Sequence, residues 1–351
     1  MGMSKRIDLT KIKKILLIRL RPIGDIVMTT PALSILRREL PHAFISYVVE
    51  PPYRKLIEGH PALDEVLVIK RKSSFVEFLK FIGNIRKRKY DLAIDFHCGP
   101  RASLITFFSN AKIKIGFRVK YRYLLYDIKV PRKKEKGGCF HSVESHVNLL
   151  KAIGIKPEKI PPLFLSPSSQ IEKERIQNFF IENNISNFKK IVLHISAGNK
   201  YRDWGVENFV KLIKLLSRHK NLKVIIIGDR KDKEIEEKIG ERVQGEFLSL
   251  VGKINLKELR ELISRANLFV GSDSGPMHVA ATTQTPIVAL FGPTTPNIFG
   301  PWMAKATVIE KKLDCRPCTQ KECIYEDFRC LRTIRPEEVY KASIKALERG
   351  N

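Results

Sequence analysis

The sequence predicts an α/β protein made of two Rossmann-like halves in series, and three observations lead to this prediction. A chain of 351 residues exceeds the size at which a single core keeps growing, so two domains are expected. Short, continuously apolar runs alternate with helical patterns, which is typical of a parallel sheet covered by helices on both faces. This alternation stops at residues 154–170, where four prolines indicate a linker, and then begins again.

Each half has its own set of predicted strands. Those of the first half are expected at 14–20, 43–49, 65–69, 90–96 and 111–117. Those of the second half are expected at 189–196, 222–228, 267–271 and 285–292. We therefore place the first domain at 1–165, the second at 166–334, and a C-terminal helix at 335–351. A proline at the start of that last segment, two acids after it and a final Arg-Gly are helix start and stop signals.

The charge of the chain indicates an anionic partner. Its 64 lysines and arginines against 37 acids give a formal net charge of +27. Nucleic acid, an anionic membrane surface and a phosphorylated substrate all fit this charge, as does a lysine-rich solvated surface. No secretory signal precedes the first strand, and prolines divide the long uncharged stretch at 274–304. We expect a cytoplasmic protein that is at most peripheral to a membrane.

The stretch "IRLRPIGDIVMTTP" at 18–31 follows the first predicted strand and carries an unusual turn. A dinucleotide-binding turn would contain Gly-x-Gly-x-x-Gly, but this one has a single glycine, so a nicotinamide dehydrogenase does not fit. Asp25 follows that glycine and is expected to project into a cleft. Pro31 leaves two alternatives: it follows a cap at Thr30, or it lies in the first turns of a helix that begins near Asp25.

The stretch "LFVGSDSGPMHVAATTQTPIVALFGPT" at 268–294 predicts a strand that ends at a helix N-terminus. Ser or Asp at the cap and Pro276 at the first helical position indicate where that helix begins. Free backbone N–H groups at such a terminus attract anions, so we expect a diphosphate here. His278 lies within the first turn of this helix and could contact the same anion or pack as a structural histidine.

A third stretch, "HISAGNKYRDWGVENFV" at 194–210, predicts a loop between a strand and a helix that begins near Trp204 to Glu207. The small residues that begin with Ser196 allow close approach of a ligand, and Lys200 and Arg202 could hold phosphate. Taken alone, the loop fits an ordinary solvated surface equally well.

These three stretches, in this order and spacing, resemble glycosyltransferase family 9, whose archetypes are the ADP-heptose:lipopolysaccharide heptosyltransferases. The resemblance covers nearly the whole chain. It implies a GT-B fold, in which two Rossmann-like domains face each other across a cleft. The C-terminal domain would hold the nucleotide sugar and the N-terminal domain the acceptor, and the C-terminal helix would cross back to the first domain. The resemblance also implies inverting chemistry without a catalytic metal.

The resemblance assigns roles to matching positions. Asp25 would be the general base, and Asp273, Ser274, Gly275 and His278 would bind the donor, with Ser196. The family's lysine before a tryptophan has no direct counterpart, so Lys200 and Arg202 compete to hold the phosphate. Asp229 and Asp232 compete for the donor ribose, and Asp232 is our choice. Acceptor contacts are expected at Arg21, Arg101 and His141, with His146 as an alternative to His141.

The function that the resemblance implies is transfer of a heptose from ADP-heptose to the phosphorylated inner core of lipopolysaccharide, at the inner membrane. Alternatives are a family member with another nucleotide sugar and a basic nucleic-acid-binding protein. The aromatic and basic run at 119–134 fits the second alternative only weakly, because it reads equally well as a loop for an anionic acceptor. We expect no nucleic-acid partner.

Four of the six cysteines cluster near the end of the chain, at Cys315, Cys318, Cys323 and Cys330. Their spacing could hold a structural zinc, but it is not the pair of Cys-x-x-Cys motifs that signals zinc strongly. Disulfides and unlinked thiols are the other two interpretations. In each case the cluster would act locally and not in catalysis, so we expect no cofactor for the reaction.

Overall fold

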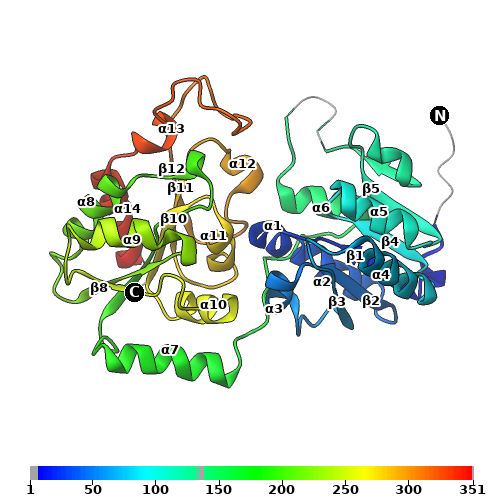
Figure 1. Ribbon diagram of the computed structural model, residues 1–351, viewed down its shortest axis with the longest axis horizontal. Helices are drawn as coiled ribbons and strands as arrows, with labels where there is room; N and C mark the ends of the chain where they lie inside the picture. The colour runs from blue at the N-terminus through cyan, green and yellow to red at the C-terminus, as the bar shows by residue number, and fades with distance from the viewer. Residues whose placement is uncertain (1–6, 133, 135–137, 350–351) are drawn as a thin grey trace. The chain divides into compact units, whose positions relative to one another are not determined.

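The computed structural model describes residues 7–132, 134 and 138–349, and the chain divides into two compact units (Figure 1). The first unit is Met1–Ser166 and the second is Pro167–Asn351. Between Gly154 and Ser169, where the linker is predicted, there is no helix or strand. The two units are described separately.

The first unit contains a six-stranded parallel sheet with the order β3-β2-β1-β4-β5-β6. Its strands are β1 (Lys14–Ile18), β2 (Phe44–Val49), β3 (Glu65–Val68), β4 (Leu92–Asp95), β5 (Ile113–Phe117) and β6 (Ile128–Val130). Its helices are α1 (Ile23–Val27), α2 (Thr30–Glu39), α3 (Arg54–Ile57), α4 (Phe75–Lys87), α5 (Pro100–Phe108) and α6 (Ser142–Lys151).

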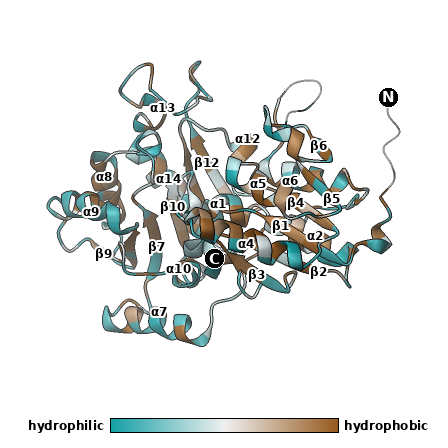
Figure 2. Ribbon diagram, turned by 45° about the vertical axis from the view of Figure 1, so that its right-hand side comes forward, coloured by the Kyte–Doolittle hydropathy of each residue, from teal (hydrophilic) through white to brown (hydrophobic). Residues whose placement is uncertain are grey.

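Successive residues of β1 point to opposite faces of this sheet, and each face has its own helix layer. Ile15 and Leu17 pack with α2 and α6 in one buried cluster. Leu16 and Ile18 pack with α4 and α5 in another. All four side chains are fully buried, which explains why the strand reads as continuously apolar. In Figure 2 the strands are largely brown for the same reason.

The second unit repeats this topology, with the sheet order β12-β11-β10-β7-β8-β9. Its strands are β7 (Lys189–His194), β8 (Leu222–Ile227), β9 (Phe247–Ser249), β10 (Leu268–Ser272), β11 (Ile287–Phe291) and β12 (Ala306–Glu310). Its helices are α7 (Gln170–Glu182), α8 (Val206–Leu216), α9 (Lys233–Gly240), α10 (Leu256–Ser264), α11 (Gly275–Ala280), α12 (Pro296–Phe299), α13 (Arg329–Arg332) and α14 (Pro336–Arg349).

The predicted α/β class is confirmed, and all nine predicted strands are present within three residues of their predicted bounds. The three strands that the sequence did not reveal are β6, β9 and β12. Each lies at the edge of its sheet, and each is short or largely exposed, so its residues lack a continuous apolar pattern.

The C-terminal helix α14, which is predicted to cross back to the first domain, packs on the core of the second unit. Val339 and Leu347 of α14 lie in the buried core of the second unit, and the helix packs on α8 and on β10 to β12. Just before the helix, the indole N–H of Trp204 donates a 2.9 Å hydrogen bond to the carbonyl of Ile334. The apolar side of α14 is thus buried against the core of the second unit.

Both alternatives for Pro31 are partly right. A short helix, α1, begins at Ile23 and carries Asp25 in its first turn. A second helix, α2, begins at Thr30 with Pro31 in its first turn, although the cap residue is Thr29. Among the described residues, no helix is both long enough and apolar enough to cross a bilayer.

Substitution of Gly116 tests how tightly the first unit is packed. A Cβ at this position would lie 2.5 Å from Cε2 of Tyr126, whose hydroxyl is held by Asp95 and Ser103. We expect Gly116→Ala to lower the free energy of unfolding of this unit by about 1–3 kcal/mol. Scanning calorimetry measures the change as a lower melting temperature.

The matched control is Gly83→Ala in α4, where a Cβ would meet no atom within 4 Å. That variant should raise stability by about 0.5–1 kcal/mol, because alanine loses less backbone entropy in a helix. Equal effects of the two variants would contradict the proposed clash.

Candidate active site

In each sheet the strands continue in opposite directions from two neighbouring central strands. The candidate site residues lie in the loops that follow these central strands. In the first unit the chain moves outward in one direction from β1 to β3 and in the other from β4 to β6. In the second unit the corresponding strands are β7 and β10. Ligands of such sheets bind at the carboxyl ends of the strands next to this switch point, where the connections diverge. The loops after these four strands therefore define two half-sites.

Asp25 lies at the half-site of the first unit, on the short helix that follows β1. Its carboxylate forms an ion pair with Nη2 of Arg19, and its side chain remains 26% exposed. Arg19 itself is buried and also donates a 2.6 Å hydrogen bond from Nη1 to the carbonyl of Phe96, which follows β4. One buried guanidinium thus ties the loops after β1 and β4 together and fixes the position of an accessible carboxylate.

A pocket of about 240 Å³ lies beside these residues, at the same edge of the sheet. Three arginines line it, Arg21 and Arg71 from loops and Arg101 from the first turn of α5, together with Glu50 and His97. Glu50 is buried and lies 3.5 Å from Nε of Arg21, so it neutralises only part of the cationic lining. Two of the predicted acceptor residues, Arg21 and Arg101, are brought together here. The pocket suits a small anionic group.

A buried polar network shapes the wall of this pocket. Asp95, at the end of β4, accepts hydrogen bonds from the backbone N–H groups of His97 and Cys98 and from the hydroxyl of Tyr126. These bonds hold the turn that presents His97. Burial, with Arg19 nearby, lowers the pKa of His97 to about 4, so its imidazole is neutral near pH 7.

The two candidate histidines near residue 140 do not line the pocket. His141 caps α6, because its Nδ1 accepts a 3.2 Å hydrogen bond from the N–H of Val143. His146 is buried, and its Nδ1 lies 3.0 Å from the carbonyl of Met28, the residue that ends α1. His146 therefore supports the helix that carries Asp25. His141, predicted to touch the acceptor, has a structural position here.

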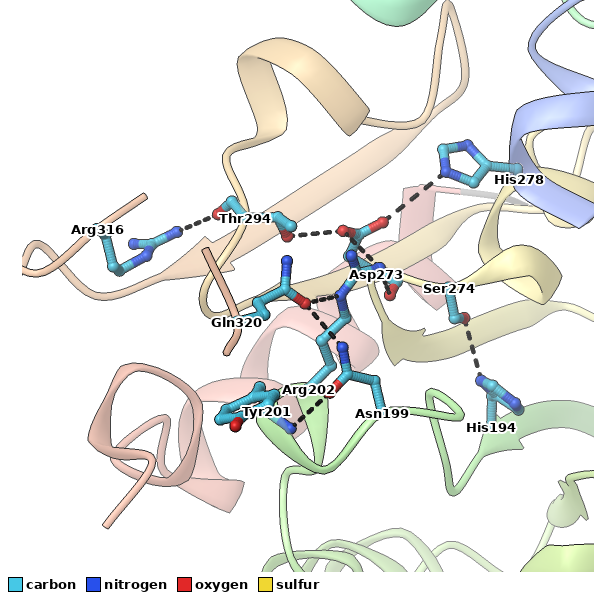
Figure 3. A network of polar contacts seen from close by, with 10 residues as sticks. All are labelled: His194, Asn199, Tyr201, Arg202, Asp273, Ser274, His278, Thr294, Arg316 and Gln320. Atoms are coloured by element: carbon cyan, nitrogen blue, oxygen red, sulfur yellow. Dashed lines mark hydrogen bonds and ion pairs between the residues drawn. The ribbon is translucent and has the colours of Figure 1, made fainter. Parts of the chain in front are cut away.

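In the second unit the carboxylate of Asp273 is the centre of a polar network (Figure 3). The side chain is buried, 4% exposed, and lies just after β10. Thr294 donates a 2.6 Å hydrogen bond to its Oδ2, Arg202 lies 3.2 Å from the same oxygen, and His278 lies 3.8 Å from Oδ1. The predicted donor-binding aspartate is thus enclosed by protein groups that it holds in place.

Arg202 is the better placed of the two competing cations. Its Nη1 also donates to the carbonyl of Asp273 at 3.1 Å, and its Nε donates to Oε1 of Gln320 at 2.9 Å. These bonds use Nε and Nη1, and within the described part of the chain the N–H groups of Nη2 have no hydrogen-bond partner. The side chain of Arg202 is 25% exposed. Lys200 is exposed instead, with its amine 5.2 Å from the ring centre of Tyr201.

The start of α11 carries the other predicted donor residues. Ser274 is its cap residue but makes no capping hydrogen bond, since its hydroxyl lies 3.2 Å from Nδ1 of His194. Gly275 is the first residue of this six-residue helix. His194 is buried at the end of β7, and burial lowers its pKa to about 4. The neutral imidazole and the serine link the loops after β7 and β10.

The remaining predicted donor residues stay close to the backbone. The hydroxyl of Ser196, after β7, accepts a 3.1 Å hydrogen bond from the N–H of Gly198 and shapes the loop. Asp232 is buried, and its Oδ2 accepts a 2.7 Å hydrogen bond from the N–H of Asp229. Asp229 is exposed at the end of the β8 loop. Of the two competing aspartates, the structure leaves Asp229 the more accessible to a ribose.

The cysteine cluster is a set of free thiols in the structure. None of Cys315, Cys318, Cys323 and Cys330 forms a disulfide. In the described part of the chain, no group of three or more histidines, cysteines and acids is placed to hold a metal ion. The segment is attached to the site by Cys318, whose N–H donates to the carbonyl of Pro293, and by Arg316, which donates to the carbonyl of Thr294.

Sequence reasoning missed several residues that complete both half-sites: Arg19, Glu50, Arg71, His97, His194, Thr294 and Gln320. Most follow a strand at its carboxyl end, so the topology would have located them once the sheet order was known. Gln320 is the exception, because it reaches Arg202 from a loop 118 residues further along the chain. No pattern in the sequence reveals such a contact.

Two parallel six-stranded sheets of this order, each with polar loops at its switch point, define the GT-B class of glycosyltransferase folds. Residues 78–329 match the model of glycosyltransferase family 9 (heptosyltransferase). The match covers more than half of the chain, and the chain therefore belongs to this family.

Individual relatives agree with this assignment. Lipopolysaccharide heptosyltransferase 3 of Escherichia coli is 26% identical over 295 residues, which cover 80% of this chain and 83% of that protein. A solved family 9 glycosyltransferase from Veillonella parvula is 25% identical, covers 99% of both chains and has a TM-score of 0.86. The ADP-heptose lipopolysaccharide heptosyltransferase II of Escherichia coli is 25% identical, with 96% and 99% coverage and a TM-score of 0.81.

The buried His194 predicts a pH dependence of stability. Its pKa falls from 6.5 in the unfolded chain to about 4 in the folded protein, so the unfolded state binds the proton first as the pH falls. Stability from this group is complete above pH 6.5 and is lost as the pH falls towards 4, by about 3 kcal/mol. Urea unfolding at a series of pH values measures this loss.

Both tryptophans, Trp204 and Trp302, belong to the second unit, so tryptophan fluorescence follows only the unit that contains His194. The control is His194→Gln, which keeps a polar side chain beside Ser274 but does not titrate. Its stability should fall less between pH 7 and 4 than that of the unchanged protein. Parallel pH curves for the two proteins would contradict the prediction.

Proposed function

We propose that this protein transfers a heptose from ADP-heptose to the phosphorylated inner core of lipopolysaccharide, with inversion at the anomeric carbon. The observation that carries the proposal is Asp25, an accessible carboxylate held by a buried arginine beside a cationic pocket. The names of the relatives support the choice of sugar and acceptor, since several are lipopolysaccharide heptosyltransferases.

Asp25 would act as the general base. Its free carboxylate oxygen accepts the proton of an acceptor hydroxyl, and the hydroxyl oxygen then attacks the anomeric carbon of the heptose. The bond from that carbon to the phosphate oxygen breaks on the opposite face, and ADP leaves with the bonding electrons. One displacement of this kind inverts the configuration. Arg19 keeps the carboxylate in place while the proton is transferred.

The second unit would hold the diphosphate of the donor. Asp273, Gln320 and Arg202 form a fixed arrangement in which the Nη2 atom of the arginine can donate to a phosphate oxygen. A guanidinium fixed in advance stabilises the charge that develops on the leaving group. Lys200 can add a mobile charge from the loop surface. With these cations the transfer is proposed to need no metal.

The cationic pocket of the first unit would bind the acceptor. The phosphorylated inner core carries negative groups, and the guanidinium groups of Arg21, Arg71 and Arg101 match their charge and geometry. Binding of such a group at the pocket places a neighbouring hydroxyl near Asp25. We also propose that the protein works in the cytoplasm at the inner face of the inner membrane, where a lipid-linked acceptor of this kind is available.

The prediction for the base concerns turnover. Asp25→Asn keeps the shape of the side chain and removes its ability to accept a proton, so kcat should fall by on the order of 10²-fold or more. Donor binding should stay unchanged. Transfer from ADP-heptose to a truncated lipopolysaccharide acceptor measures turnover, and calorimetry measures donor binding.

The matched control is Asp64→Asn, which breaks another carboxylate–arginine pair of the first unit, with Arg37 at 2.6 Å. Asp64 precedes β3 and so lies at the amino ends of the strands, away from the half-site. Its removal should leave kcat of the folded protein unchanged. Full turnover by Asp25→Asn would remove Asp25 from the role of base.

The prediction for the donor side concerns nucleotide affinity. Arg202→Ala should weaken ADP binding by about 10-fold to 100-fold, because a charge-assisted hydrogen bond to phosphate contributes about 1.5–3 kcal/mol. Lys200→Ala should weaken it only a few-fold, on the order expected for an exposed charge pair. Isothermal titration calorimetry with ADP measures both.

The same titration with UDP and GDP tests the sugar nucleotide. ADP should bind more tightly than either, and a preference for UDP or GDP would favour a family member with another donor. A larger loss of ADP affinity in Lys200→Ala than in Arg202→Ala would reverse the assignment of the two cations.

A further inference from the structure

Helices α4 and α5 of the first unit expose an unusual amount of apolar surface. Six of the fifteen large apolar residues that are exposed in the described chain lie on these two helices: Phe75, Val76, Leu79, Leu104, Phe107 and Phe108. Each is between 40% and 75% exposed. The two helices pack side by side on one face of the sheet, and these six residues are called the α4–α5 patch.

The composition of α5 shows that the patch is not a consequence of core packing. Its buried side is provided by Ala102 and Ile105, which face the sheet. Its outer side carries Leu104, Phe107 and Phe108, and no charged residue occurs between Arg101 and Lys112. A helix that is apolar on all sides is usually covered on all sides. An exposed apolar surface of this kind marks a site of interaction.

The charges around the patch indicate its partner. Residues 70–89 contain eight lysines and arginines and a single acid, Glu77, which caps α4 through Ser74. Lys72 precedes α4, Lys80 and Lys87 lie on it, and all three are exposed. Exposed aromatic and aliphatic side chains among lysines match an anionic lipid surface, with rings in the interface and amines at the phosphates. A second copy of the same surface would be repelled by like charge.

The patch is also continuous with the cationic pocket. Arg101, which lines the pocket, lies in the first turn of α5 and donates 2.5 Å hydrogen bonds to the carbonyl of Arg71 and the hydroxyl of Ser73, just before α4. Its guanidinium lies 5.8 Å from the ring centre of Phe78. The pocket mouth and the first turns of α4 and α5 therefore belong to one surface.

We propose that the α4–α5 patch docks the first unit on an anionic lipid bilayer. This inference rests on the proposed function, because it explains how an acceptor whose acyl chains stay in the bilayer could present its phosphorylated saccharide to the pocket. The apolar side chains enter the interface, and the surrounding lysines and arginines contact lipid phosphates. The surface binds bilayer lipid itself, so docking needs no acceptor and no donor.

Vesicle sedimentation tests the proposal with the full chain. The protein should bind vesicles that contain phosphatidylglycerol and bind phosphatidylcholine vesicles weakly. Phe75→Ser with Leu79→Ser should lower the partition coefficient of the protein onto these vesicles by about 10-fold or more. The reason is that two apolar side chains that would enter the lipid interface are lost. The matched control is Ile171→Ser with Ile181→Ser on α7, which removes two similarly exposed apolar residues from the second unit and should have no effect.

A second set of variants tests the charges. Lys72→Ala, Lys80→Ala and Lys87→Ala together should weaken binding to phosphatidylglycerol vesicles by on the order of 100-fold, since each basic residue near the surface contributes about fivefold. The control replaces the exposed Lys211, Lys214 and Lys220 of the second unit. Equal losses in both sets, or unchanged binding in the patch variants, would overturn the proposal. So would dissociation of a dimer by the patch variants in light scattering, which would make the patch a self-association surface.

Measurements of heptose transfer distinguish a failure of this proposal from a failure of the proposed function. On a lipid-free acceptor fragment in solution, Phe75→Ser with Leu79→Ser should transfer heptose at the unchanged rate, because neither residue lines the pocket. Transfer without vesicle binding would refute docking and leave the function intact. Vesicle binding without any transfer by the unchanged protein would refute the function and leave docking intact.

Discussion

The reversal of strand order beside β1 and β7 is the constraint on which both half-sites depend. In a parallel sheet covered by helices on both faces, the side chains along the inner strands are buried and apolar, so polar side chains gather at the strand ends. At the switch point the connections leave towards opposite faces, and an opening forms between them. Asp25 and His97 follow β1 and β4, while Ser196 and Asp273 follow β7 and β10. The same geometry thus places unrelated side chains at equivalent positions.

Buried charges give these openings a fixed shape. Arg19 and Asp273 are both almost fully buried, and each contacts groups from more than one loop. Burial of an ion pair contributes little net stability, because removal of water offsets the attraction between the charges. The gain is positional: a carboxylate at Asp25 and a guanidinium at Arg202 are held before any ligand arrives. In the proposed reaction, such preorganisation would let Asp25 accept a proton and Arg202 stabilise the charge on the leaving group without moving.

The central strands of both sheets could be predicted because burial on two faces requires continuously apolar runs. The edge strands β6, β9 and β12 could not, since they are short or partly exposed. Asp25 and the segment around Asp273 stood out by their motifs. Arg19 and Gln320 did not, because their roles depend on partners distant in sequence, such as Phe96 and Arg202. The packing of α14 on the core of the second unit could not be predicted, since an apolar stripe does not specify which core it joins. The carboxylate of Asp232, predicted to bind the donor ribose, accepts a hydrogen bond within its own turn, a contact that the sequence does not reveal.

The single glycine of the first turn fits the roles proposed for the two units. A glycine-rich turn lets a backbone approach a pyrophosphate, and such a turn would expose α1 to the ligand. Here Gly24 is buried, and the next residue carries the carboxylate that Arg19 holds. Phosphate at this turn would lie beside Asp25 and be repelled by it. A unit in which Asp25 acts as the proposed base would therefore not also bind the diphosphate at the same loop. In the second unit Asp273 is enclosed and Arg202 is partly exposed, an arrangement whose charge would suit the proposed donor site.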